Sequence, residues 1–330
     1  MSRASIVALL VAAEILIAGM AVYAVSGAGT TFASGMHRLS FTPAQVEPIS
    51  AGDTPNVVID DRASKVSVGL SGDGRVHVRD LTEMRGAIYS NASYPQLRVA
   101  RTNDGVRVDR PAAPRLSVVL FGADVEEIQV EVPSGSHVEI AHCAGAEIDG
   151  VTGGVSVSSQ DGRVKLSDLS GTIDARSDDG RIIATNVRAD RLTMESADGR
   201  LVLLNVSAGS LTARTHDGRI EANGLNLTGS QPDSTLHTDD GPLQINGAFA
   251  PSGSYELSTN DGSIELHLAR DADLAIAAST GSGRVVVDGS SYESDDSSQR
   301  TIRLGSGAGS MKLATADGSI HILTNGAVQQ

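Results

Sequence analysis

Seven Asp-Gly dipeptides carry the most regularly spaced acidic groups of the chain. The first four aspartates are 18, 19 and 19 residues apart. The seven are Asp161, Asp179, Asp198, Asp217, Asp240, Asp261 and Asp317. A column of carboxylates could bind calcium, but calcium takes about six to eight oxygen ligands, and calcium-binding repeats carry a Gly-rich nonapeptide that is missing here. We therefore expect turns, in which each aspartate caps backbone N–H groups and each glycine takes a positive φ.

An arginine directly follows each of the first four dipeptides, at Arg163, Arg181, Arg200 and Arg219. Stacked guanidinium groups could bind an acidic glycan, or an envelope protein or polymer that carries anionic groups, through bidentate contacts. Alternatively, the arginines screen the neighbouring aspartates, because like charges repel when they are stacked at one strand spacing. The pattern favours screening and leaves a ligand along this ladder as a hypothesis.

Paired carboxylates near histidines are the features that could support catalysis. The pairs are Asp178–Asp179, Asp239–Asp240 and Asp295–Asp296, and the histidines are His216 and His237. Polysaccharide lyases and hydrolases use clustered carboxylates, but neighbouring residues on a strand point to opposite faces. The eight histidines show no metal-ligand spacing. We predict no catalytic, cofactor-binding or metal-binding residues and no cofactor, and a carbohydrate-active enzyme remains the alternative.

Cys143 is the only cysteine, which excludes an internal disulfide and a cysteine-based metal cluster. His142 would be its base, but the two side chains point to opposite faces of a strand. We expect Cys143 to be a small buried apolar residue. A separate cluster of arginines is expected on a solvated strand face, balanced by Asp104 and Asp109. Its members are Arg98, Arg101, Arg107, Arg110 and Arg115.

The repeat around each Asp-Gly predicts two short strands. A serine or threonine stands two residues before the aspartate, mostly apolar residues stand four and six before it, and apolar residues stand three and five after it. Such columns arise when equivalent residues stack on one another, which favours an all-β parallel β-helix, or β-solenoid, with coils of about 19 residues. An antiparallel meander is the alternative. Aromatic residues make up only 3% of the chain, too few for the interior of a barrel.

The N-terminus contains an apolar run from Ile6 to Val25 that is interrupted by Glu14. Twenty residues suffice to cross a bilayer as a helix, and Arg3 precedes the run, so the remainder is expected outside the cytoplasm. We predict a single-pass membrane anchor over residues 1–26. A signal peptide that is cleaved to release a secreted or periplasmic protein is the alternative. Residues 27–50 are expected to be a flexible linker.

The net charge of −14 makes nucleic acid a poor partner. We therefore expect a membrane contact through Ile6–Val25 and no nucleic-acid partner.

The stretch "VEVPSGSHVEI", the serial Ser-x-Asp-Gly coils, a late "GSG" followed by a tyrosine, and the terminal "TADGSIHI" resemble the DUF4097 family of bacterial adhesin-like proteins. The resemblance covers roughly residues 50–325. It implies a parallel β-helix that is extracytoplasmic and often tethered to the membrane, and it says little about activity. We expect the solenoid domain over residues 51–325 and a C-terminal tail over 326–330. The expected function is non-catalytic: an adhesin-like repeat surface for contact with the envelope, a glycan or a protein.

Overall fold

The computed structural model describes residues 37–111, 117–287, 290–293 and 300–324, and all of its regular elements are strands. The predicted anchor Ile6–Val25 and the tail 326–330 lie outside the described residues. No helix within the described ranges is long and apolar enough to cross a membrane. The chain forms two compact units, and the second contains most of the strands.

The smaller unit is an antiparallel sheet made from three distant segments of the chain. Its strands are β1 (His37–Arg38), β5 (Glu83–Ser90) and β8 (Ser117–Val125), with β5 in the middle. Leu39, Ile88 and Tyr94 are buried together. The Phe41 and Tyr94 rings pack edge to face with 4.8 Å between their centroids. Residues 37 and 38 were expected within a linker, but here they pair with Tyr89 and Ser90.

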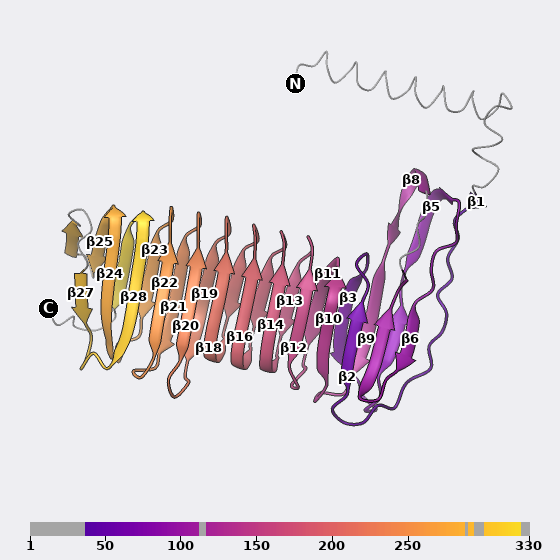
Figure 1. Cartoon of the computed structure of the whole chain (residues 1–330), viewed down its shortest axis with the longest axis horizontal. Coiled ribbons are helices and arrows are strands. Elements are labelled where there is room, and N and C mark those ends of the chain that lie inside the picture. The colour runs from indigo at the N-terminus through magenta and orange to yellow at the C-terminus, as the bar shows by residue number, and fades with distance from the viewer. Residues whose placement is uncertain (1–36, 112–116, 288–289, 294–299, 325–330) are drawn as a thin grey trace, which may run out of the picture. The chain divides into compact units, whose positions relative to one another are not determined.

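The larger unit is a stack of coils, each with one strand on each of two faces (Figure 1). The neighbouring strands within each face pair in parallel, which excludes the antiparallel meander for this part of the chain. Along the stack, the first face contains β7 (Gly105–Asp109), β2 (Asn56–Asp60), β10 (His137–Cys143), β12 (Val155–Ser159), β14 (Ser170–Ser177), β16 (Arg188–Ser196), β18 (Ser207–Thr215), β20 (Asp233–Thr238), β22 (Ser254–Thr259), β28 (Gly309–Asp317) and β24 (Leu274–Ser282).

The second face follows the same order of coils. It contains β9 (Glu127–Val132), β3 (Lys65–Leu70), β11 (Gly145–Asp149), β13 (Val164–Ser167), β15 (Ile182–Thr185), β17 (Leu201–Leu204), β19 (Ile220–Leu227), β21 (Leu243–Phe249), β23 (Ile264–Leu268), β29 (Ile320–Thr324) and β25 (Arg284–Val287). In the regular part, Ile182 pairs with Leu201 and Leu201 with Ile220, which is the predicted 19-residue register.

The coils at both ends of the stack are out of sequence order. The coil of β2 and β3 lies between the coil of β7 and β9 and the coil of β10 and β11. In the same way, β28 and β29 lie between β22/β23 and β24/β25. Antiparallel strands cover both ends: β6 (Arg98–Arg101) and β4 (His77–Asp80) at one, and β27 (Arg300–Arg303) and β26 (Ser290–Glu293) at the other.

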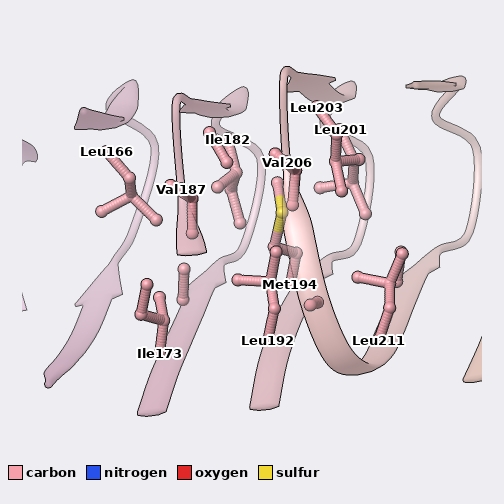
Figure 2. Close-up of a cluster of buried hydrophobic side chains, with 14 of the residues drawn as sticks. Leu166, Ile173, Ile182, Val187, Leu192, Met194, Leu201, Leu203, Val206 and Leu211 are labelled. Atoms are coloured by element: carbon pink, nitrogen blue, oxygen red, sulfur yellow. The ribbon is translucent and has the colours of Figure 1, made fainter. Parts of the chain in front are cut away.

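Aliphatic side chains in register fill the space between the two faces (Figure 2). Leu192 and Met194 of β16 face Leu201 and Leu203 of β17, and all four are fully buried. Val206, which follows β17, closes the same layer and is 1% exposed. Each interior coil therefore buries its apolar surface against the coil on either side, as expected for a solenoid.

Candidate functional site

The corner between the two strands of a coil, here called the Asp-Gly corner, is closed by the hydroxyl column rather than by the aspartates. Thr238 is fully buried, and its Oγ1 lies 3.0 Å from the carbonyl oxygen of His216 and 2.8 Å from that of Gly218 in the preceding coil. The N–H of Gly241 donates to the same Oγ1 over 3.1 Å. Ser196 makes the equivalent contacts two coils earlier. The hydroxyl therefore performs the capping that we had assigned to the aspartate.

The glycines of these corners are needed for close packing and not for a positive φ. None of the seven, all of which are described, has a positive φ, so that expectation was wrong. A Cβ added to Gly199 would lie 2.0 Å from the carbonyl oxygen of Gly180, and one added to Gly218 would lie 2.1 Å from that of Gly199. Each glycine thus lets the next coil approach to strand-pairing distance.

The corner aspartates Asp161, Asp179, Asp198, Asp217, Asp240 and Asp261 are exposed to solvent. In the described ranges, no group of three or more His, Cys, Asp or Glu residues is placed to hold a metal ion. Asp295 and Asp296, the third predicted pair, lie outside these ranges. Each described coil of this column therefore exposes one corner carboxylate to solvent.

The four arginines do form one column, as predicted from their spacing. The N–H groups of Val164, Ile182 and Leu201 bond to the carbonyl oxygens of Arg181, Arg200 and Arg219 in the next coil. Arg219 pairs with Glu221 over 3.0 Å, and Arg200 reaches the same carboxylate over 3.9 Å. Arg163 and Arg181 are exposed and have no ion pair among the described residues. The four arginines do not form ion pairs with the corner aspartates. The acidic partner of Arg200 and Arg219 is Glu221 instead.

Asp239 joins two histidines into a network that the spacing did not predict. His216 Nδ1 bonds to Asp239 Oδ2, while His237 Nε2 lies 3.2 Å from Asp239 Oδ1. Asn260 Nδ2 donates to Asp239 over 2.9 Å, and Ser258 Oγ lies 2.9 Å from His237 Nδ1. The hydrogen bond from His216, followed by the one from His237, lowers the pKa of Asp239. The residues come from three coils, so only the fold brings them together.

This network has the order of a serine, a histidine and an aspartate, but the strand that carries the serine is fully paired. Ser258 lies within β22, which is paired on both sides with β20 and β28. The backbone N–H groups of this strand are therefore held in its ladders and do not form an oxyanion hole, the largest contributor to such catalysis. Asp240 points away into solvent, so the pair Asp239–Asp240 does not converge.

Cys143 is fully buried, and burial raises the pKa of its thiol. His142 turns to Asp60 instead, with 3.0 Å between Nδ1 and Oδ1. Both observations agree with the prediction that Cys143 is structural.

Arg110 differs from its expected place on a solvated face. Its side chain is 4% exposed and bonds to Asp61 over 2.8 Å and to Asp80 over 3.0 Å. Arg107 does lie on the surface, beside Asp60 and Asp109. The cluster of charged residues in the sequence did not predict that the side chain of Arg110, directly after β7, is buried.

A second corner of the coil, here called the Asn corner, directly follows the strands β11, β13, β15 and β17 of the second face and recurs at Gly224 within β19. Asp168, Asn186 and Asn205 each have a φ of 54°, and Gly150 and Gly224 continue the column with φ of 78° and 71°. Asn and Asp tolerate this left-handed conformation better than other side chains. Asn186 Nδ2 donates to Asp168 Oδ1 over 3.2 Å, and Asn205 Nδ2 donates to Asn186 Oδ1 over 3.4 Å. The same spacing of 18 and 19 residues was visible in the sequence, but these residues were missed.

A groove of about 780 Å³ runs beside the Asn corner. Its floor includes the buried Leu169 and Val206. Its polar wall is contributed by five coils: Thr152, Asp168, Ser170, Asn186, Arg188, Asn205, Ser207, Gly224 and Asn226. It is larger than a second hollow of about 400 Å³ beside Leu204, Glu221 and Asn223.

The family model of Toastrack DUF4097 matches residues 53–323 of this chain. The chain belongs to the DUF4097 family. A comparison with curated proteins finds no match for this DUF4097 protein.

Among solved structures, the DUF4097 protein is similar to a "putative adhesin" from Bacteroides fragilis, with 12% identity over 86% of this chain and 99% of that one and a TM-score of 0.38. A "putative adhesin" from Parabacteroides distasonis shares 10% identity over 87% and 95%, with a TM-score of 0.39. A "putative cell adhesion protein" from Clostridium sporogenes shares 9% identity over 88% and 99%, with a TM-score of 0.19. None of these similarities bears on what this chain binds.

Proposed function

We propose that this DUF4097 protein is a non-catalytic, adhesin-like β-solenoid that presents its repeated side chains to an acidic glycan or a protein of the cell envelope. One observation carries the proposal: the outward side chains stand in register from coil to coil, so a single contact is repeated at the strand spacing of about 4.8 Å. A repeated ligand can then meet several equivalent groups at once, which raises its apparent affinity.

The arginine column is the part of this surface best suited to an anion. Arg163 and Arg181 are exposed and have no ion pair within the described residues, although the chain carries a net charge of −14. Their guanidinium groups keep all of their donors for carboxylate or phosphate oxygens of a ligand. Arg200 and Arg219 share Glu221, so we expect them to contribute less.

The proposal includes attachment to the membrane through Ile6–Val25, with the solenoid outside the cytoplasm. It rests on the length of this apolar run and on Arg3 before it. The mass of the mature N-terminus distinguishes an intact anchor from a cleaved signal peptide. A protein that begins near residue 25 would contradict the anchor and leave a secreted or periplasmic solenoid.

Binding of the full-length protein in detergent to polygalacturonate, an acidic glycan, tests the role of the arginines. We expect the double variant R163Q/R181Q to bind about tenfold more weakly, since charge-assisted hydrogen bonds are lost. R214Q is the matched control, because Arg214 is exposed on the first face, and it should bind as the unmodified protein does. Equal binding by R163Q/R181Q and R214Q would refute the assignment of the ligand to this column.

A further inference from the structure

We propose that the groove beside the Asn corner is a binding site for an extended, linear polysaccharide, separate from the arginine column. The groove crosses the coils at Thr152, Ser170, Arg188, Ser207 and Asn226. Five coils at a strand spacing of about 4.8 Å give it a length of about 19 Å. A groove of this form suits an unbranched chain of several units better than a compact small molecule.

The side chains of the groove provide donors and acceptors that the fold does not use up. Asn186 gives one N–H to Asp168 and accepts one from Asn205, which leaves a second N–H and a second lone pair on its amide. Arg188, Ser170, Ser207 and Asn226 have no side-chain hydrogen bond among the described residues. Hydroxyl groups, which both donate and accept, are the ligand groups that match this mixture.

The backbone of the groove favours a polysaccharide over a peptide strand. The N–H groups of Ser170, Arg188 and Ser207 bond to the carbonyl oxygens of Val151, Leu169 and Val187 in the preceding coil. Those of Asp168, Asn186 and Asn205 bond to the next coil. A peptide that added itself as a strand would need free backbone groups along an edge, and these are already paired.

The floor of the groove offers a peptide no apolar pocket either. The two apolar lining residues, Leu169 and Val206, are buried, and Val206 lies beside Met194 in the core (Figure 2). Arg188 is the one cation among the lining residues, and Asp168 is one carboxylate, so the groove lacks the positive charge that a nucleic acid requires. Arg188 instead suits an occasional carboxylate or phosphate on a largely neutral chain.

The lining contains no aromatic side chain on which a sugar ring could stack. Affinity must therefore come from hydrogen bonds repeated along the chain, and it should rise with ligand length up to the extent of the groove. This dependence on length is a property that a surface of scattered polar residues would not show.

The test uses the full-length protein in detergent and three linear hexasaccharides: cellohexaose, chitohexaose and hexagalacturonate. We expect at least one to bind about tenfold or more tightly than its disaccharide. The variant N186G/N205G removes the two amides, and glycine suits their left-handed backbone as it does at positions 150 and 224. We expect this variant to bind that hexasaccharide about tenfold more weakly. R188Q should weaken hexagalacturonate more than cellohexaose.

N223G/N246G is the matched control, because Asn246 Nδ2 donates to Asn223 Oδ1 over 3.3 Å in an amide pair outside the groove. Its binding should equal that of the unmodified protein. The proposal is overturned if no hexasaccharide binds, or if N186G/N205G binds as N223G/N246G does. R163Q/R181Q separates the two sites: loss of hexasaccharide binding in this variant alone would assign the ligand to the arginine column and refute the groove.

Discussion

At the scale of the residue, the corner glycines and hydroxyls are fixed by the distance between coils. A strand neighbour lies about 4.8 Å away, and at the Asp-Gly corner the carbonyl oxygen of one glycine occupies the place of the next Cβ. The neighbouring hydroxyl closes the corner by bonding to two carbonyl oxygens of the preceding coil. These two columns are therefore structural, although in the sequence they accompany residues that could perform chemistry.

We expect Gly199→Ala to lower the free energy of unfolding by about 2 kcal/mol or more. Its Cβ would lie 2.0 Å from the backbone oxygen of Gly180 and 2.4 Å from Ser196 Oγ, so the coils would have to separate. Chemical denaturation measures the change. Gly69→Ala is the control, since nothing lies within 4 Å of an added Cβ there, and it should change stability by less than about 0.5 kcal/mol. Similar losses in both variants would contradict the packing argument.

Thr238→Val should cost about 1–3 kcal/mol, because it leaves the N–H of Gly241 and the carbonyl oxygens of His216 and Gly218 without their partner in a buried corner. Thr235 lies on the outer side of the same strand, β20, and is half-buried. Thr235→Val therefore provides a control of identical chemistry that should be almost neutral. Thermal unfolding of both variants checks this difference, and a reversed order would rule out the hydroxyl as the corner cap.

At the scale of the element, one buried ion-pair cluster connects three strands at the first end of the stack. Asp61 directly follows β2, Asp80 ends β4, and Arg110 directly follows β7. Their side chains are 4%, 1% and 4% exposed, and Ser64 Oγ donates to Asp61 over 2.8 Å. The cluster thus fixes the cap strand β4 to the two coils that are out of sequence order.

Arg110→Met should destabilise the protein by about 3–5 kcal/mol, because it leaves two buried carboxylates without their cation. Arg107→Met removes an arginine that is 48% exposed and pairs with Asp60 and Asp109, so it should cost less than about 1 kcal/mol. Denaturant unfolding of the two variants measures the contrast. A small effect at Arg110 would show that water reaches these carboxylates.

At the scale of the whole molecule, the ends of the second unit decide whether the stack can continue into another copy. An end coil with unpaired backbone N–H and C=O groups could pair with strands of another molecule. Here β6 covers one end and carries Arg98 and Arg101, while β27 covers the other and carries Arg300 and Arg303 (Figure 1). Charged residues on an edge strand oppose edge-to-edge pairing, and like charges at both ends oppose head-to-tail stacking.

Replacing Arg98 and Arg101 by threonine should therefore promote self-association. Threonine favours strands and removes the repulsion, so we expect the sedimentation coefficient in detergent to rise with concentration more steeply than for the unmodified protein. Arg214→Thr, on an exposed position of the first face, is the control and should not differ from the unmodified protein. An unchanged profile for R98T/R101T would mean that backbone geometry alone protects the edge.

The sequence by itself determined the class of fold, the register of the coils and the inward residues. A period near 19 with apolar residues at positions such as Leu192, Leu201 and Leu211 is enough to predict these features, because equivalent residues stack on one another in every coil. Alternation alone would point Cys143 outward after the inward Val138 and Ile140, and the register shift between Ile140 and Cys143 is what buries it. Local periodicity could not assign the capping to Thr238 instead of Asp240, because both occupy equally regular columns.

Only the tertiary structure decided which distant groups meet. The coil of β2 and β3 is inserted between later coils, Arg110 is buried between Asp61 and Asp80, and Asp239 collects two histidines from different coils. The small sheet of β1, β5 and β8 joins three distant segments of the chain, and the groove at Asn186 and Asn205 is lined by residues of five coils. The physical reason is that the 19-residue period specifies only how equivalent residues of neighbouring coils contact each other. The changed order of the end coils, the separate sheet and the groove depend on contacts between residues that are not equivalent in the repeat.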